Sequence, residues 1–205
     1  MVAEVRIYVE GGGDNKDTKA HLRQGLGEFL KGLVQIARER RIRWHIVVCG
    51  SRHETFNNYV TALKLHPDAF NVLLVDAEGP INHSPWQHLK TRDQWNPPPV
   101  EDDHCHLMVQ MTEAWLVADI EALSRFYGRG FRAQAIPSQA NVEQISKDAL
   151  RAGLKQATRD TQPGEYHKTR HTPKLLALVD ANKVRQSAFY CDRLFTTLTN
   201  VLEQS

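Results

Sequence analysis

The sequence lacks the features that mark membrane-spanning and secreted proteins. No apolar run among its 205 residues approaches the roughly 20 residues that a transmembrane helix requires. The chain starts directly with a strand pattern, without a charged and then apolar leader. Its three cysteines are widely spaced and odd in number, which favours free thiols in a reducing compartment. We therefore expect a cytoplasmic protein that has no membrane partner.

Several nucleotide and metal motifs are also missing. The glycine-rich stretch after residue 10 lacks the G-K-[ST] of a Walker A loop and the G-x-G-x-x-G spacing of dinucleotide-binding folds. The chain contains neither C-x-x-C nor H-E-x-x-H, two common signs of a zinc site. These absences leave carboxylates as the main candidates for chemistry.

The charge is small overall but uneven along the chain. A formal net charge of +2 does not by itself indicate nucleic-acid binding. Residues 1–120 hold 13 Lys and Arg against 16 Asp and Glu, whereas residues 151–205 hold 9 against 5. An acidic segment followed by a basic segment is expected if a carboxylate metal site faces a phosphate-binding surface. It is expected equally if both segments only form ordinary solvent-exposed surface.

The hydrophobic pattern predicts an α/β fold with a parallel sheet. Strand patterns alternate with amphipathic helix patterns, which favours right-handed crossovers between parallel strands. In such sheets, functional groups collect beyond the carboxyl ends of the strands. The predicted strands are 4–10, 41–49 and 70–75, and the predicted helices are 16–41 and 52–65.

The remainder of the chain is expected to be mainly helical. We predict a long polar loop over 79–103, a fourth strand over 104–111 and a helix over 112–126. A catalytic core would then occupy 1–126, with a helical C-terminal extension over 127–205 packed on it. Its helices are expected over 141–158, from Thr172 as the cap with Pro173 at the first position, and over 187–203.

Glu10 ends the first predicted strand and is followed directly by Gly11, Gly12 and Gly13. Glycines let the backbone turn sharply and let a bulky anion approach. The turn also offers amide N–H groups at a helix N-terminus, where phosphate binds readily. The alternative is that the glycines form an ordinary tight turn and that Glu10 is simply exposed to solvent at the end of the strand.

Asp76 and Glu78 follow the third predicted strand two positions apart, so that their side chains can point the same way. Paired carboxylates repel each other unless a cation neutralises them, and Mg²⁺ (or Mn²⁺) prefers such oxygen ligands. Glu113, early in a predicted helix, is a candidate further ligand or a partner of the helix dipole. Asp14 is a further candidate for the set of ligands around the metal ion.

The combination of E-G after the first strand and D-x-E after the third resembles the Toprim domain of topoisomerases, bacterial primases and several nucleases. The resemblance covers about residues 4–125. It implies that Glu10 is a general acid/base or metal ligand and that Asp76 and Glu78 are metal ligands. Glu78 stands where the family usually has a second aspartate.

More narrowly, the chain resembles small stand-alone Toprim-like proteins of prokaryotic defence loci, often encoded beside an ABC-type or AAA-type ATPase. The stretches that carry this likeness are Val109 to Asp119, Tyr166 to Lys168, Leu175 to Leu176 and Cys191 to Phe195. The resemblance implies nuclease or toxin activity and an ATPase partner.

A basic cluster in the C-terminal segment is the best candidate for contact with nucleic acid. It consists of Lys168, Arg170, His171 and Lys174. These side chains would hold a phosphate backbone opposite the acidic site. The alternative is that they are solvated or pair with nearby carboxylates.

Two further clusters have ordinary explanations. His104 and His106 share one strand face and would form a zinc site with His83 or His88, or else they are packed or solvated histidines. The arginine run over 38–43 ends a helix pattern, where basic residues complement the helix dipole.

The sequence thus predicts an Mg²⁺-dependent nuclease that cleaves DNA or RNA, acting as a toxin or effector in anti-phage defence. A non-catalytic sensor or regulatory subunit that acts through a partner ATPase is the main alternative. A small-molecule phosphohydrolase is a third. Whether the chain forms a homo-oligomer is left open.

Overall fold

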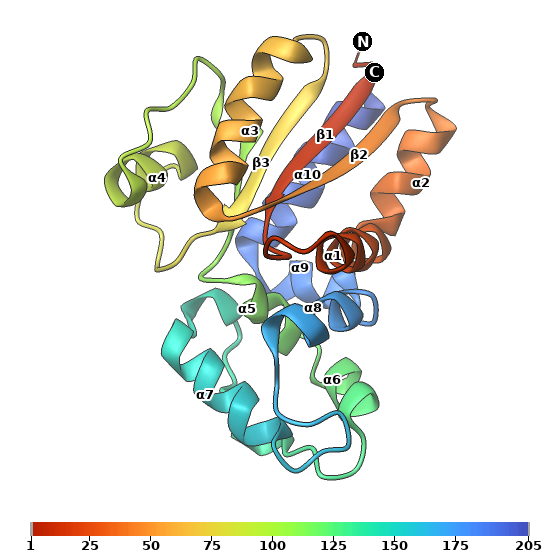
Figure 1. The fold of residues 1–205 in the computed structure, drawn as a ribbon, viewed down its shortest axis with the longest axis vertical. Coiled ribbons are helices and arrows are strands. Elements are labelled where there is room, and N and C mark those ends of the chain that lie inside the picture. The colour runs from red at the N-terminus through yellow and green to blue at the C-terminus, as the bar shows by residue number, and fades with distance from the viewer. Residues whose placement is uncertain (1, 205) are drawn as a thin grey trace.

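The computed structural model describes residues 2–204, and its centre is a four-stranded sheet in which all strands are parallel (Figure 1). The strand order is β2-β1-β3-β4. The strands are β1 (Glu4–Glu10), β2 (Arg43–Gly50), β3 (Phe70–Asp76) and β4 (Cys105–Met108). The predicted α/β fold with a parallel sheet is therefore confirmed, in a Rossmann-like arrangement.

Helices cover both faces of this sheet and form the lower half of the molecule in Figure 1. The described α-helices are α1 (Lys16–Phe29), α2 (Lys31–Glu39), α3 (Arg52–Leu65), α4 (Pro85–Asp93), α5 (Thr112–Val117), α6 (Ile120–Tyr127), α7 (Lys147–Thr158), α8 (Lys168–Leu176), α9 (Ala181–Ser187) and α10 (Phe189–Glu203). Short 3-10 helices lie at Asp102–His104, Ala133–Ala135 and Val142–Gln144.

Successive residues of β1 and β3 point to opposite faces, and each face has its own apolar layer. Val9 and Leu74 belong to a large cluster that includes buried side chains of α1, α2 and α10. Tyr8 and Leu73, one position away in each strand, belong to a second cluster with side chains of α3 and α4. The alternation of the strands thus fixes which helices lie on which face.

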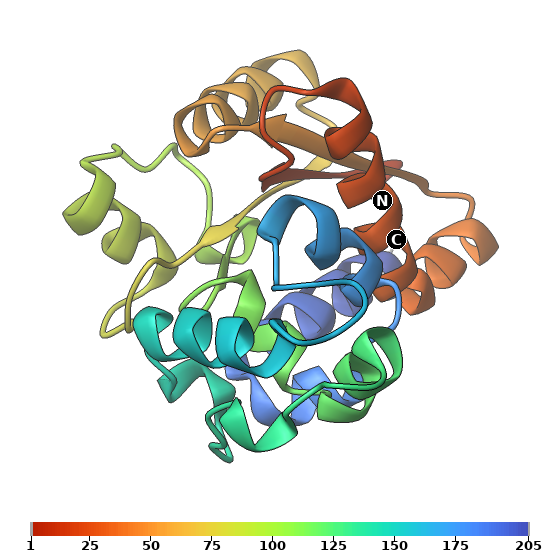
Figure 2. The same cartoon turned by 60° about the horizontal axis from the view of Figure 1, so that its bottom comes forward.

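The helices after residue 126 share the core of the sheet domain. α10 packs against α2 and β4, and α8 packs along α1. Leu194 and Leu198 of α10 lie in the same apolar cluster as the residues of β1. Figure 2 shows α8 beside α1 at the edge where the strands end. None of the helices described within residues 2–204 is long and apolar enough to cross a membrane.

Several predicted boundaries are wrong for local physical reasons. The predicted helix over 16–41 is two helices that meet at Leu30, whose backbone leaves the helical region. The predicted helix over 112–126 breaks at Asp119, whose side chain accepts the Ala122 N–H and starts α6. Of the predicted strand over 104–111, only Cys105–Met108 (β4) forms a strand.

Two other corrections affect the functional surface. The predicted loop over 79–103 contains α4, which buries Trp86 and Leu89 against the sheet. The predicted cap at Thr172 is also wrong, because α8 begins at Lys168 and includes Pro173 in its interior. The basic residues therefore lie within a helix, from Lys168 at its start to Lys174 in its last turn.

Candidate metal and phosphate site

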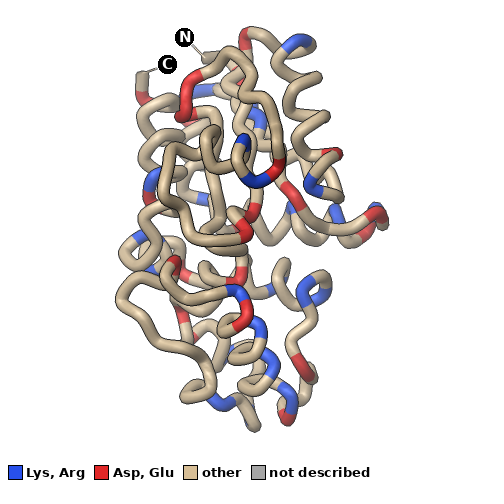
Figure 3. The backbone as a smooth tube through the Cα atoms, turned by 90° about the vertical axis from the view of Figure 1, so that its left-hand side faces the viewer, with Lys and Arg blue, Asp and Glu red and all other residues tan. Residues whose placement is uncertain are grey.

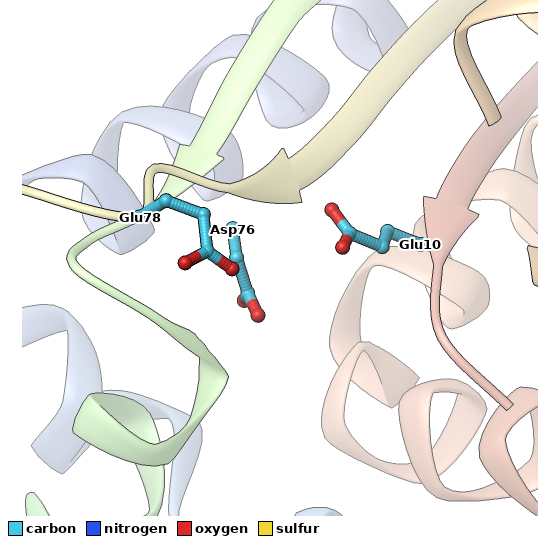
Figure 4. A group of neighbouring side chains, drawn as sticks. All are labelled: Glu10, Asp76 and Glu78. Atoms are coloured by element: carbon cyan, nitrogen blue, oxygen red, sulfur yellow. The ribbon is translucent and has the colours of Figure 1, made fainter. Parts of the chain in front are cut away.

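The carboxyl ends of β1 and β3 bring three acidic side chains together. β1 and β3 are neighbours in the sheet, so Glu10 and Asp76 leave it side by side. Glu78 follows at a positive φ of 65°, and its N–H donates to the Gln110 carbonyl at 2.7 Å. One ligand oxygen from each of the three lies within 4.8 Å of the others. Figure 4 shows Glu10 pointing from β1 toward Asp76 and Glu78. We refer to these three residues as the acid cluster.

Asp76 is held from two directions. Its side chain is almost completely buried, and Oδ1 accepts both the N–H and the hydroxyl of Thr112 at 2.8 Å. Its other oxygen, Oδ2, lies 2.9 Å from Nζ of Lys168. The start of α5 and the start of α8 therefore fix the orientation of this carboxylate.

Arg52, the first residue of α3, ties the strand ends together. Its guanidinium donates to Glu10 Oε2 at 3.0 Å and to the Asp76 carbonyl at 2.6 Å. It also makes two hydrogen bonds to the carboxylate of Asp93, at 2.9 and 2.8 Å. Such a bidentate pair holds the guanidinium in one position.

The electrostatic environment of Glu10 favours its protonated form. Burial raises the pKa of Glu10, and the nearby negative charge of Asp76 raises it further. The guanidinium of Arg52 opposes both effects without cancelling them. A carboxyl group with a raised pKa is better suited to take a proton near neutral pH than an ordinary exposed glutamate.

Glu78 has basic partners from two other helices. It forms an ion pair with Lys147 at the start of α7, and Nη2 of Arg92 in α4 lies 4.0 Å from its Oε2. Burial lowers the pKa of Lys147, and the positive charge of Arg151 lowers it further. Together with Arg52 of α3 and Lys168 of α8, four separate helices thus supply a cation to the acid cluster.

Glu113 lies next to the cluster and is buried at 1% exposure. Its Oε1 accepts the hydroxyl of Tyr166 at 3.0 Å, and that hydroxyl also lies 2.7 Å from Thr172 Oγ1. Its Oε2 has no hydrogen-bond partner among the described residues and lies 3.5 Å from Nζ of Lys168. Burial and the charge of Glu113 raise the pKa of Tyr166 well above its ordinary value.

Lys168 is the cation shared by Asp76 and Glu113. Burial alone would lower its pKa, but attraction to Asp76 and Glu113 outweighs this effect and raises the pKa. The side chain is about half exposed, at 49%. The ammonium group is therefore charged where it contacts the acidic site, and part of the side chain is open to solvent.

A cavity of about 190 Å³ opens beside these groups. Glu10, Asp76 and Lys168 lie at its polar end, and the glycine turn Gly11–Gly13 forms one wall. Gly11 has a φ of 127°, and a Cβ there would lie 2.8 Å from Leu22 Cδ2. The turn can pass this close to α1 only because residue 11 is glycine.

The donor set fits a hard divalent cation. Mg²⁺ binds oxygen ligands at about 2.0–2.1 Å, which places neighbouring ligand atoms roughly 3–4 Å apart. The acid cluster, with its ligand atoms within 4.8 Å of one another, meets this requirement after small side-chain adjustments. The Oε2 of Glu113, which accepts no hydrogen bond among the described residues and has only the ion pair with Lys168, is a further buried acceptor close by. Carboxylates alone favour Mg²⁺ or Mn²⁺ over softer metals.

One protein-family profile matches the sequence over most of its length. The profile described as "Domain of unknown function (DUF4276)" matches residues 9–199, which is most of the chain. The chain belongs to this family. No curated protein and no solved structure matches it. The DUF4276 match spans both the strand ends that carry the acid cluster and the helix that carries Lys168.

The predicted phosphate-binding cluster divides into three parts in this DUF4276 protein. Lys168 enters the acid cluster, whereas Arg170 and Lys174 are exposed on the outer side of α8. His171 is buried, and its Nδ1 lies 2.9 Å from the hydroxyl of Tyr127. Asp14 is exposed in the turn before α1 and is not part of the acid cluster. We therefore omit His171 and Asp14 from the candidate site.

His104, at the end of the 3-10 helix before β4, and His106 of β4 are packed side chains in this DUF4276 protein. Nδ1 of His104 lies 2.7 Å from the Asn71 carbonyl, and Nε2 of His106 lies 2.9 Å from the Asp103 carbonyl. Burial lowers the pKa of His106 to about 3. Within residues 2–204, the side chains that lie close enough together to hold a metal ion are those of the acid cluster. The zinc alternative therefore has no geometric support.

Sequence reasoning missed Arg52, Thr112, Lys147 and Tyr166. Arg52 follows the end of β2 and so lies at the same edge of the sheet as the predicted acids, which was a usable signal. Thr112 precedes Glu113 at the start of a predicted helix. Lys147 and Tyr166 come from distant helical segments, and no local pattern marks their approach to the DUF4276 site.

Figure 3 shows basic and acidic residues mixed over the length of the molecule in this view. The uneven distribution along the chain therefore does not produce one acidic half and one basic half in space. Instead, basic residues of the C-terminal segment pair with acids of the N-terminal segment at one site.

Proposed function

We propose that this chain is an Mg²⁺-dependent nuclease that hydrolyses a phosphodiester bond in DNA or RNA. The observation that carries the proposal is the acid cluster at the ends of β1 and β3, with Lys168 and an open cavity directly beside it. Carboxylates that gather at strand ends beside a cation suited to phosphate are the parts that metal-dependent phosphoryl chemistry requires.

Each residue has a role that follows from its contacts. Glu10, Asp76 and Glu78 would hold the metal, which when bound polarises the phosphate and stabilises the leaving oxygen. If its carboxylate is not itself bound to the metal, Glu10, whose pKa is raised, would instead accept a proton from the attacking water. Lys168 binds a non-bridging phosphate oxygen. Glu113 positions the ammonium of Lys168 from the opposite side.

The resemblance to Toprim domains supports the same chemistry and extends it. The parallel sheet, the glutamate after β1 and the acid pair after β3 agree with that resemblance. On this basis we propose a cytoplasmic effector of anti-phage defence that works with an ABC-type or AAA-type ATPase. The exposed Arg170 and Lys174 would guide the nucleic acid toward the site.

The test is a cleavage assay on single- and double-stranded DNA and RNA with Mg²⁺, Mn²⁺ or a chelator. We expect the purified chain to cleave at least one substrate only when a metal ion is supplied. Glu10→Gln should lower the rate by about 10²–10⁴-fold if Glu10 transfers a proton. Glu28→Gln, on the exposed face of α1, is the matched control and should cleave normally. Cleavage that persists in the chelator, or a Glu10→Gln rate equal to that of the wild type, would contradict the proposal.

A regulatory subunit without catalysis is the second candidate, because each member of the acid cluster already has a basic partner. Arg52 pairs with Glu10, Lys168 with Asp76, and Lys147 with Glu78. A network balanced in this way is stable without a metal ion. Metal-independent folding combined with no cleavage of any nucleic acid would favour this candidate.

A further inference from the structure

The cavity beside the acid cluster has one polar end and one apolar wall. Glu10, Asp76 and Lys168 form the polar end. The apolar wall comes from four separate elements and consists of Val9 of β1, Leu22 and Leu26 of α1, Met108 of β4, and Pro173 and Leu176 of α8. A metal ion and a phosphate would occupy only the polar end. The apolar wall therefore needs another occupant, joined to that phosphate.

The size of the cavity limits this occupant to about one ring. An engineered protein cavity of about 150 Å³ binds benzene. The cavity here measures about 190 Å³ including its polar end, so the part left beside a metal ion and a phosphate suits no more than a single six-membered ring. The two fused rings of a purine require more room. A pyrimidine nucleotide fits this description, because its single planar ring stacks on apolar side chains and is joined to the phosphodiester through a sugar.

The walls cannot easily separate to admit a larger ring. α1 and α8 meet at Gly25 and Pro173, where a Cβ on residue 25 would collide with the Pro173 carbonyl. Pro173 also lines the cavity, so this close contact sets the distance between its two helical walls. On the opposite side, the glycine turn lies directly against Leu22. Packed interiors of this kind resist expansion.

The cavity also offers polar groups for the edge of a base. Thr169 of α8 lines it, and Gly13 adds backbone groups. The hydroxyl of Thr18 in α1 also lines it and can accept a hydrogen bond, since it donates its own proton to the Gly12 and Asn15 carbonyls. A base that stacks on apolar side chains and bonds through its edge is bound in the way that proteins hold unstacked bases.

We propose that this cavity binds the base of an unpaired pyrimidine nucleotide whose phosphate lies at the acid cluster. The inference rests on the proposed nuclease function and names its substrate class, a single-stranded nucleic acid with a pyrimidine at the cleaved position. A base inside a duplex is paired and stacked, and it enters such a cavity only after it leaves the helix, which costs free energy.

The experiment compares cleavage rates on 12-nucleotide probes with Mn²⁺: oligo(dT), oligo(dA), oligo(U), oligo(A) and the dT·dA duplex. The pyrimidine probe of the preferred sugar should be cleaved at least about tenfold faster than the matching purine probe, as a hydrophobic pocket discriminates by size. The duplex should be cleaved more slowly than the single strand.

Two variants connect this preference to the cavity. Thr169→Phe places a ring inside the cavity, and we expect it to remove the pyrimidine preference while Mn²⁺ binding and melting temperature stay unchanged. Thr196→Phe makes the same change on an exposed position of α10 and should behave as the wild type. Equal rates on pyrimidine and purine probes in the wild type would overturn the assignment.

Binding measurements separate this inference from the proposed function. Calorimetry with thymidine 5′-monophosphate and deoxyadenosine 5′-monophosphate, each with Mn²⁺, needs no cleavage. A chain that cleaves no probe but binds the thymidine compound at least about tenfold more tightly keeps the cavity assignment and overturns the nuclease. That preference should disappear in Thr169→Phe. A chain without preference in either assay overturns the cavity assignment.

Discussion

The ammonium group of Lys168 lies 2.9 Å from Oδ2 of Asp76, although the two residues are 92 positions apart in the sequence. This contact joins the first turn of α8 to the end of β3. It makes the C-terminal helical segment part of the acidic site. Of the predicted basic cluster, Lys168 lies with the acids at the ends of the parallel strands, whereas Arg170 and Lys174 stay on the outer side of α8.

Removal of this ammonium group should change metal affinity and activity in opposite directions. In Lys168→Met, a positive charge that competes with the metal for Asp76 is lost, and we expect Mn²⁺ to bind about tenfold more tightly or better. Cleavage should fall, because the phosphate loses its cation. Arg170→Met, on the exposed side of the same helix, is the control and should leave Mn²⁺ affinity unchanged. Unchanged affinity in Lys168→Met would show that the ion pair does not compete with the metal.

The contact between α1 and α8 can be tested with two glycines of one helix. Gly25→Ala should lower the free energy of unfolding by roughly 1–3 kcal/mol, because the new methyl group collides with the Pro173 carbonyl. Gly27→Ala meets no atom within 4 Å and should raise stability by roughly 0.5–1 kcal/mol, since alanine favours the helix. Urea unfolding of both variants measures the difference. Similar values for the two would mean that α1 and α8 are not in close contact.

Asp76 should matter for stability as well as for metal binding. Asp76→Ala leaves the Thr112 N–H and hydroxyl without their acceptor, whereas Asp76→Asn keeps an oxygen at that position. We expect the alanine variant to be less stable than the asparagine variant by roughly 1–3 kcal/mol in urea unfolding. Equal stabilities would show that the Thr112 hydrogen bonds contribute little.

The buried side chain of Glu143 should make the free energy of unfolding fall as the pH rises. Burial raises the pKa of Glu143 from 4.5 to about 7, although its side chain accepts the Tyr190 N–H at 2.7 Å. Between these values the folded chain holds a proton that the unfolded chain has released, so stability falls as pH rises from about 4.5 to about 7. The uncharged Glu143→Gln variant lacks this contribution. The melting temperature of the wild type relative to Glu143→Gln should therefore be higher at pH 5 than at pH 8, and the reverse order would contradict the assignment.

The sequence predicted those parts of the site that follow directly from strands. Glu10, Asp76 and Glu78 come at the ends of apolar strands, and parallel strands bring such ends to one edge. The partners that come from distant helices were not predictable. Lys168 was identified for its charge, but its partner Asp76 depends on how α8 packs along α1. Local patterns contain no information on such packing, and the mistaken start of α8 has the same origin.

Helix breaks escaped prediction for a related reason. The apolar spacing continues through Leu30 and through Asp119, so periodicity alone joins α1 to α2 and α5 to α6. At Asp119 the break depends on a side-chain cap and on contacts with the distant Asp180 and Lys183. Tertiary contacts thus decide where these helices end.

Calorimetric titration of Mn²⁺ into the purified chain tests the central claim most directly, because it measures metal binding at the acid cluster without a substrate. We predict saturable binding in the wild type and in Glu28→Gln, and loss of that binding in Asp76→Asn. Thermal unfolding of the same metal-free samples establishes that the variant is folded. If folded Asp76→Asn binds Mn²⁺ as tightly as the wild type, or if the wild type binds none, then Glu10, Asp76 and Glu78 are not a metal site.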